Sequence, residues 1–123
     1  MKNSKVNQPN HIKLITWQEF ENVELRVGTI ISVDDFPQAR KPAYIIQVDF
    51  GQDIGIKKSS AQITDIYRKN DLIGKQIIGV LNFPPKQIGP IRSEFLITGF
   101  RGEDGAVVLA VPERKAPDGA KLA

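Results

Sequence analysis

Short apolar segments that alternate with polar residues, each ended by glycine or proline, constrain the fold of this chain most. Between residues 23 and 33 the odd positions hold valine, leucine, threonine or isoleucine, and the even positions are mostly polar. This period of two is typical of a strand with one solvated face. Similar strand-like runs occur at residues 43–50, 54–59, 75–81, 95–99 and 106–111. The chain is therefore predicted to be mostly β.

The balance of aliphatic residues favours the same fold class. The sequence contains sixteen isoleucines and nine valines against seven leucines and eight alanines. Side chains branched at Cβ suit a pleated sheet better than a helix. Gly28 falls on the polar side of the first run. A missing side chain there permits a bulge, a sharp bend or close approach of another backbone, as in a small coiled barrel.

Two short helices are predicted. Thr16-Trp17-Gln18-Glu19 is a capping box, which marks the start of a helix. Ile63, Ile66 and Tyr67 are spaced by three and four, which indicates about two helical turns ending at Asn70. The order strand, strand, strand, helix, strand, strand is that of an OB-fold. The expected fold is therefore all-β with short helices, built as a five-stranded OB-fold β-barrel.

The chain is expected to form one domain behind a flexible arm. Residues 1–14 show no sustained period and are predicted to be this N-terminal arm, and residues 15–123 to be the OB-fold domain. The apolar end of the arm, from Ile12 to Trp17, and an extended C-terminal segment from Pro112 have little room to be buried on a lone barrel. We therefore expect a homodimer.

Composition also limits the environment and the partners. No cysteine is present, so neither a disulfide framework nor a thiolate metal site can form, and a reducing cytoplasm is the expected compartment. No run of 18 apolar residues occurs, so no membrane insertion is expected. The net charge is +3 and the sequence pI about 9.3, which favours polyanions and acidic surfaces as partners.

The sequence does not indicate an enzyme. It has no glycine-rich phosphate-binding motif, and its single histidine, His11, lies in the arm. Ser59, Ser60 and Ser93 therefore have no histidine partner in the predicted domain. The acidic pairs at residues 34–35 and 103–104 have too few ligands around them for a metal site. No cofactor and no metal are expected.

Residues 82–96 hold most of the candidate binding chemistry. Pro84-Pro85 cannot donate to a ladder, and Gly89-Pro90 sets a second bend, so this connection is predicted to be a stiff loop between two strands. A stiff loop presents its polar and charged side chains in fixed directions, as recognition requires. The alternative is that these breakers merely turn the chain.

Several motifs resemble those of the EMAP II-like tRNA-binding domain family. The segments concerned are Val27-Gly28-Thr29-Ile30, Phe36-Pro37-Gln38-Ala39-Arg40-Lys41, Val48-Asp49-Phe50-Gly51, Leu72-Ile73-Gly74-Lys75 and residues 82–94. An R-x-G-x-I strand, a P-x-A loop and a V-D-x-G strand end recur in this order in that family. The resemblance covers residues 20–122. It is closest to the CsaA branch, for which residues 82–94 together with Ser59-Ser60-Ala61-Gln62 are specific.

The resemblance implies an OB barrel, a homodimer, and binding of either tRNA or unfolded and export-bound polypeptides. It assigns the family's binding positions to Lys41, Asn82, Lys86, Ser93 and Glu94. The family's tRNA binders usually have H-P-x-A-D-K-L at residues 36–42 and S-x-G-M at residues 93–96, and this chain departs from both patterns. These departures favour the CsaA branch. The full set of candidate binding residues is Arg40, Lys41, Lys57, Ser59, Asn82, Phe83, Lys86, Arg92, Ser93 and Glu94.

Two binding hypotheses follow. In the first, cations on loops and strand ends bind tRNA, mainly through its phosphate backbone, because Phe36 and Phe83 are the only loop rings expected to stack on bases. In the second, Phe36, Phe83 and Ile88 form an apolar cleft that binds extended polypeptides without any RNA ligand. A third possibility is that the basic residues only keep a dimer soluble. The sequence identifies neither the tRNA nor the polypeptide.

Overall fold

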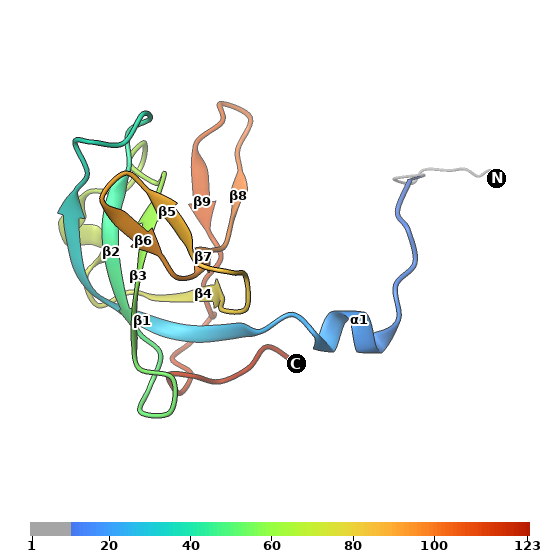
Figure 1. The fold of residues 1–123 in the computed structure, drawn as a ribbon. Helices are drawn as coiled ribbons and strands as arrows, with labels where there is room; N and C mark the ends of the chain where they lie inside the picture. The colour runs from blue at the N-terminus through green and yellow to red at the C-terminus, as the bar shows by residue number, and fades with distance from the viewer. Residues whose placement is uncertain (1–10) are drawn as a thin grey trace.

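The computed structural model describes residues 11–123 and arranges short strands around one apolar core (Figure 1). The elements are α1 (Trp17–Glu21), β1 (Leu25–Asp35), β2 (Tyr44–Asp49), β3 (Ile56–Ala61), α2 (Lys69–Leu72), β4 (Gln76–Val80), β5 (Lys86–Ile88), β6 (Ile91–Ser93), β7 (Leu96–Ile97), β8 (Gly99–Arg101) and β9 (Val107–Leu109). Within the described part of the chain, no helix is long and apolar enough to cross a membrane.

A five-stranded antiparallel sheet forms the barrel. Its strand order is β3-β2-β1-β4-β7, and two further hairpins, β5–β6 and β8–β9, extend from it. Helix α2 lies between β3 and β4 in the chain. The main chain at Glu94 bonds to Lys58 on β3, with Glu94 N donating to Lys58 O at 2.8 Å, which brings the two outer strands together. The predicted fold, an OB-fold barrel with short helices, is confirmed.

The inward face of β1 differs from the predicted one. The register against β2 shifts between Ile30 and Ser32, so a bulge separates the two halves of the strand. Before the bulge the buried residues include Gly28 and Ile30, and after it Val33 is buried, whereas Ile31 is 42% exposed. The expectation that all odd positions share the apolar face and that Gly28 is on the polar side is therefore wrong.

Gly28 provides the space that Phe50 occupies in the core. A Cβ at residue 28 would lie 2.6 Å from Phe50 Cδ1 and 2.5 Å from Val48 Cγ1. Phe50 is 1% exposed and packs edge-on against Phe95, with the ring centroids 5.1 Å apart. Close approach was expected at Gly28, but the partner is a core ring and not another backbone.

The two helices differ in how well the sequence predicted them. Helix α1 begins where the capping box indicated, with Glu19 N donating to Thr16 Oγ1 at 3.1 Å and Thr16 N donating to Glu19 Oε1 at 2.9 Å. The two-turn helix ending at Asn70 is wrong, because α2 is a single turn that begins at Lys69. Ile63 is instead 2% exposed in the core.

The C-terminal segment bends at residues 113–114, turns at residues 118–119 and is fixed along the first half of β1. The expectation that a lone barrel has little room for this segment is therefore wrong. Gly119 N donates to Val27 O at 2.7 Å, and Leu122 N donates to Leu25 O at 2.8 Å. Glu24 adds ion pairs to Arg26 at 2.7 Å and to Lys121 at 3.1 Å. Strand β2 pairs with β1 only from Thr29 onward. The C-terminal segment therefore pairs with the part of the same β1 edge that β2 leaves open.

These ion pairs alter the titration of Glu24. Hydrogen bonds from Arg26, and then from Lys121, lower the pKa of Glu24 below its usual 4.5. A carboxyl with a lowered folded-state pKa stabilises the fold above its unfolded pKa, and this stabilisation is lost as the pH falls through the folded value. The attachment of the C-terminal segment therefore weakens in acid.

The predicted N-terminal arm can be followed only in part. Residues 1–10 lie outside the described residues, and residues 11–14 are exposed and belong to no helix or strand. Leu14 is 96% exposed and Ile12 69%. Helix α1 lies beside the barrel in Figure 1, and none of its residues is buried. The apolar end of the arm is therefore not covered by its own barrel.

Substitution of Gly28 by alanine tests the packing around Phe50. We expect Gly28→Ala to lower the free energy of unfolding by about 1–3 kcal/mol, because two buried side chains would have to move. Urea denaturation followed by tryptophan fluorescence or circular dichroism measures this. Gly102→Ala is the matched control, since its nearest contact is the end of the Asp104 side chain at 3.2 Å on an exposed loop. Equal stability of the two variants would contradict the packing argument.

Candidate functional site

Three connections lie together at one end of the barrel, which we call the loop end. They are residues 36–43 between β1 and β2, the β5–β6 hairpin and the β8–β9 hairpin, and all three rise to the same side in Figure 1. A Cβ on Gly89, in the turn of the β5–β6 hairpin, would lie 3.8 Å from Phe36 Cζ. Lys41 and Arg101, from the first and third connections, line one small cleft. Residues far apart in the sequence thus share this surface.

Phe36, at the start of the loop after β1, packs beneath the turn of the β5–β6 hairpin. It is 4% exposed and lies under the turn at Gly89. The expectation that Phe36 presents a free ring to a base or a peptide is therefore wrong. A loop aromatic next to proline gives no local signal of burial, because the cover comes from a hairpin more than forty residues later. Phe83, the other predicted loop ring, is 56% exposed.

The stiff connection predicted at residues 82–96 contains a short hairpin that the sequence analysis did not separate. Lys86 pairs with Ser93 and Gln87 with Arg92. Gly89 has φ +56°, a conformation that favours glycine, and Gln87 Nε2 donates to Gly89 O at 2.8 Å across the turn. Isoleucines on both sides of Gly89-Pro90 are the signal that could have predicted it. The hairpin holds Lys86 and Arg92 exposed at the surface.

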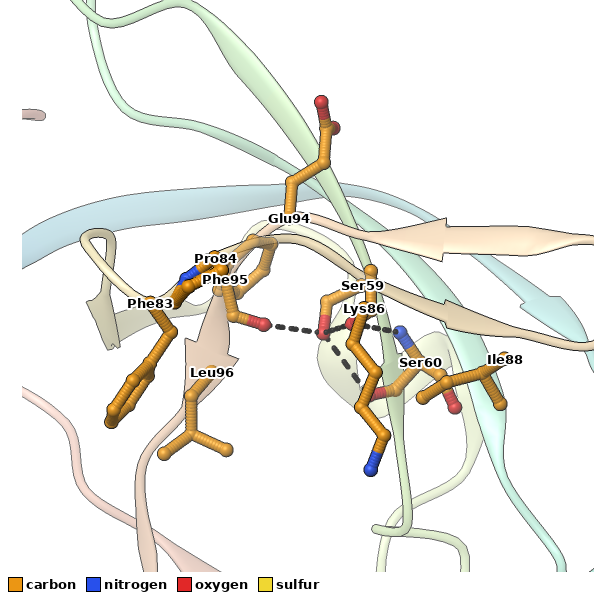
Figure 2. Close-up of a pocket in the computed structure, with 10 residues that line it drawn as sticks. Ser59, Ser60, Phe83, Pro84, Lys86, Ile88, Glu94, Phe95 and Leu96 are labelled. Atoms are coloured by element: carbon orange, nitrogen blue, oxygen red, sulfur yellow. Dashed lines mark hydrogen bonds between the residues drawn. The ribbon is translucent and has the colours of Figure 1, made fainter.

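A pocket of about 410 Å³ opens between this hairpin and strands β3 and β7 (Figure 2). Phe83, Pro84 and Leu96 form its apolar side, and Leu96 is 51% exposed. In Figure 2, Lys86 and Ile88 lie on the opposite side, and the Lys86 ammonium points the same way as the ring of Phe83. The remaining lining residues are Ser59, Ser60, Ser93, Glu94 and Phe95. Ser60, Pro84, Phe95 and Leu96 were not among the predicted binding residues, whereas Ile88 was predicted for the polypeptide cleft.

The two predicted serines join β3 to β6 and do not point freely into the pocket. Ser59 is 1% exposed, and its hydroxyl lies 2.8 Å from Phe95 O and 3.0 Å from Ser93 Oγ. Because a carbonyl can only accept, Ser59 donates to Phe95 O, and the hydroxyl of Ser93 donates to Ser59. Ser93 Oγ in turn accepts from Ser60 N at 3.3 Å. Both hydroxyl protons are therefore used inside the protein.

Glu94 continues the same connection. Its carboxylate accepts from Lys58 N at 2.9 Å, while its own N–H donates to Lys58 O. A side chain thus completes a hydrogen bond that a neighbouring strand would otherwise supply. We call Ser59, Ser93 and Glu94, with their bonds to β3, the seam of the barrel. The seam fixes the floor of the pocket.

Asn82 also has a positioning role in the structure. Its Oδ1 accepts from Glu24 N at 3.0 Å, and its Nδ2 donates to Asn22 O at 2.6 Å. The amide therefore joins the end of β4 to the segment between α1 and β1. Sequence analysis pointed to Asn82 through its place in the loop, but its partners lie 58 and 60 residues away.

The predicted cations do not all gather on one face. Arg40, Lys41, Lys86 and Arg92 are exposed at the loop end. Lys57 lies near the start of β3, opposite Val48, and is only half exposed, at the other end of the barrel. Lys69 pairs with Asp35 at 3.0 Å, and this hydrogen bond raises the pKa of Lys69. Its charge is therefore partly balanced within the fold.

No group of three or more histidine, aspartate and glutamate side chains that could hold a metal occurs among residues 11–123. The loop end offers cations, an exposed ring and a partly apolar pocket. Such a surface can bind polyanions or polypeptides by complementarity.

Comparison with known proteins identifies the family. The model described as "Putative tRNA binding domain" matches residues 25–121. The chain is also similar to curated methionine–tRNA ligases, with 29% identity over 122 residues to that of Thermococcus onnurineus and 34% over 110 residues to that of Nanoarchaeum equitans. It spans only 16% and 14% of the lengths of those two proteins.

Solved structures of similar length resemble the whole described fold. The CsaA chaperone protein of Picrophilus torridus is 49% identical, with a TM-score of 0.83 over 89% of this chain and 100% of that chain. The chaperone CsaA of Bacillus anthracis is 42% identical, with a TM-score of 0.84 over 90% of this chain and 100% of that chain. The chain therefore belongs to the tRNA-binding domain family and, within it, is of the CsaA type.

Proposed function

We propose that this protein binds tRNA, without catalysing a reaction, through the loop end of its barrel. The observation that supports this most is that Lys41, Lys86 and Arg92, from two separate connections, are exposed at the same end. The family match over residues 25–121 and the similar segment of methionine–tRNA ligases support the same ligand.

The side chains at the loop end suit the phosphate backbone of a folded RNA. A short hairpin already fixes the backbone of the cations that it carries, so only their side chains lose conformational entropy when they meet phosphates. Phe83 is the one predicted stacking ring that is exposed, at 56%. Phe100 of β8 is a second exposed ring, at 69%. Because exposed cations outnumber the exposed rings, contact with the phosphates of a structured RNA fits this surface better.

Salt-dependent titration of tRNA tests the proposal. We expect the logarithm of the affinity to fall linearly with the logarithm of salt concentration, with a slope of about −0.9 per phosphate contact on a duplex. Lys86→Gln should weaken binding to different tRNAs alike and reduce the slope by about one. Fluorescence anisotropy with labelled tRNA measures both effects.

Lys115→Gln is the control for Lys86→Gln, because it removes the same charge from an exposed position on the C-terminal segment. This control should leave the slope unchanged. A wild-type affinity that does not respond to salt would rule out binding through phosphates.

A second candidate function, binding of unfolded or export-bound polypeptides, is favoured by the pocket. Phe83, Pro84 and Leu96 offer an apolar surface beside the Lys86 ammonium, in a volume of about 410 Å³. Apolar stretches flanked by acidic residues would complement this arrangement with little demand on sequence. The two CsaA structures similar to this chain are described as chaperones.

A Phe83→Ser variant separates the two functions. We expect it to reduce capture of immobilised peptides and protection of a denatured client from aggregation, because it removes the largest exposed apolar side chain at the pocket, while the salt slope for tRNA stays unchanged. Ile73→Ser is the control, since Ile73 is similarly exposed, at 52%, away from the pocket. If wild-type protein neither captures peptides nor slows aggregation, the polypeptide hypothesis fails.

We also propose that the protein is a homodimer. Leu14 is 96% exposed and Trp17 68%, and the ring of Trp17 packs against Phe20 of its own helix, with ring centroids 5.3 Å apart. A second copy of the chain could cover this apolar helix and the end of the arm before it.

Light scattering at micromolar concentration tests the dimer. We expect twice the monomer mass for the wild type and a shift towards the monomer for Leu14→Ser, which leaves the capping box of α1 intact. Ile66→Ser, at a residue 50% exposed on the barrel, should remain dimeric. A monomeric wild type would contradict the proposal.

A further inference from the structure

A second cleft at the loop end contains cations from two separate connections. It has a volume of about 180 Å³ and is lined by Lys41 and Pro42, by Gln62, Thr64 and Asp65, and by Arg101 and Gly105. Arg101 belongs to β8 and was not among the predicted binding residues, because a single arginine on a short strand gives no signal of its own. The fold brings it to the same cleft as Lys41.

The structure holds Arg101 in place without neutralising it. Its Nη1 donates to Gly105 O at 3.1 Å, across its own hairpin. None of the four ion pairs found among residues 11–123 includes Lys41 or Arg101. Both side chains are exposed. A guanidinium that is fixed by one carbonyl keeps further N–H groups for a ligand.

The rest of the lining restricts the ligand. Gln62 and Thr64 bring an amide and a hydroxyl to the lining. Asp65 brings the only carboxylate of the cleft, and the hairpin tip beyond Arg101 carries Glu103 and Asp104. Arg101 is the residue of β8 nearest the hairpin turn, and Gly105 of that turn also lines the cleft, so an anion bound there would lie beside the turn that carries both acids.

We infer that this cleft is a phosphate subsite of the RNA-binding surface, in which Lys41 and Arg101 contact one phosphodiester of the RNA backbone. The inference rests on the proposed tRNA binding and extends it to the β8–β9 hairpin. A guanidinium and an ammonium in the lining of one small polar cleft suit one compact anion. The carboxylate of Asp65 repels an anion in the cleft. Removing its charge should therefore strengthen binding, whereas removing the charge of Arg101 should weaken it.

The test compares Arg101→Gln, Asp65→Asn and Arg114→Gln in the full chain. Arg114 is exposed on the C-terminal segment, so Arg114→Gln makes the same charge change away from the cleft. Affinity for unmodified tRNA is measured at about 50 mM and about 200 mM salt, and the first value is divided by the second. Loss of one phosphate contact reduces this ratio by about threefold. Unfolding by urea checks that all variants remain folded.

We expect this threefold reduction for Arg101→Gln, tighter binding at low salt for Asp65→Asn, and neither change for Arg114→Gln. If Arg101→Gln behaves like Arg114→Gln while wild-type protein binds tRNA, the subsite is wrong and the proposed function stands. Weaker binding by Asp65→Asn would also overturn the subsite. If the wild type does not bind tRNA at either salt concentration, both proposals fail.

Discussion

The seam between β3 and the segment that leads from β6 to β7 is the interaction on which the rest of this structure depends. An open five-stranded sheet would leave both outer strands with unpaired backbone groups, which a barrel must satisfy when it closes. Here Glu94 satisfies Lys58 through its carboxylate and its N–H, and Ser93 accepts from Ser60 N. Ser59 then anchors Ser93 from the buried side. Side chains thus replace part of a strand ladder.

This closure explains why residues that resemble the family's binding positions are not all ligand contacts. Ser59 and Ser93 have their hydroxyl protons engaged within the protein, and Asn82 bonds two backbone groups near α1. These residues hold the β5–β6 hairpin and the pocket floor in place, while Lys86, Arg92 and Phe83 stay exposed on them. Positioning residues and exposed residues alternate along one short stretch of sequence.

Much of the fold could be predicted because its signals are local. The capping box at Thr16 spans only four residues, and the order of the first strands along the chain follows from short runs separated by glycine and proline. The features that were missed depend on distant partners. The bulge at Ile31 turns β1 so that Gly28 faces Phe50, and Phe36 is buried by a hairpin that comes much later in the chain. Ile63 is not helical, because its side chain packs into the core.

The candidate site shows the same division. Cations on loops were visible in the sequence, but which of them share a surface was not. Lys57 looked equivalent to Lys86, yet it lies at the opposite end of the barrel, whereas Arg101 comes next to Lys41 only because β8 and β9 rise beside the first loop. Spacing in a sequence does not determine proximity across a barrel.

The path of the C-terminal segment sets the direction in which this protein can be tethered. Asp118 and Gly119 lie against Gly51 and Phe50, at the far end of β2 from the residues that lead into it from the loop end. In Figure 1 the C-terminus emerges on that far side, near α1. A surface, a label or a second protein joined behind Ala123 would leave the loop end facing outward. The C-terminal end of the chain is therefore separate from the exposed cations of the loop end.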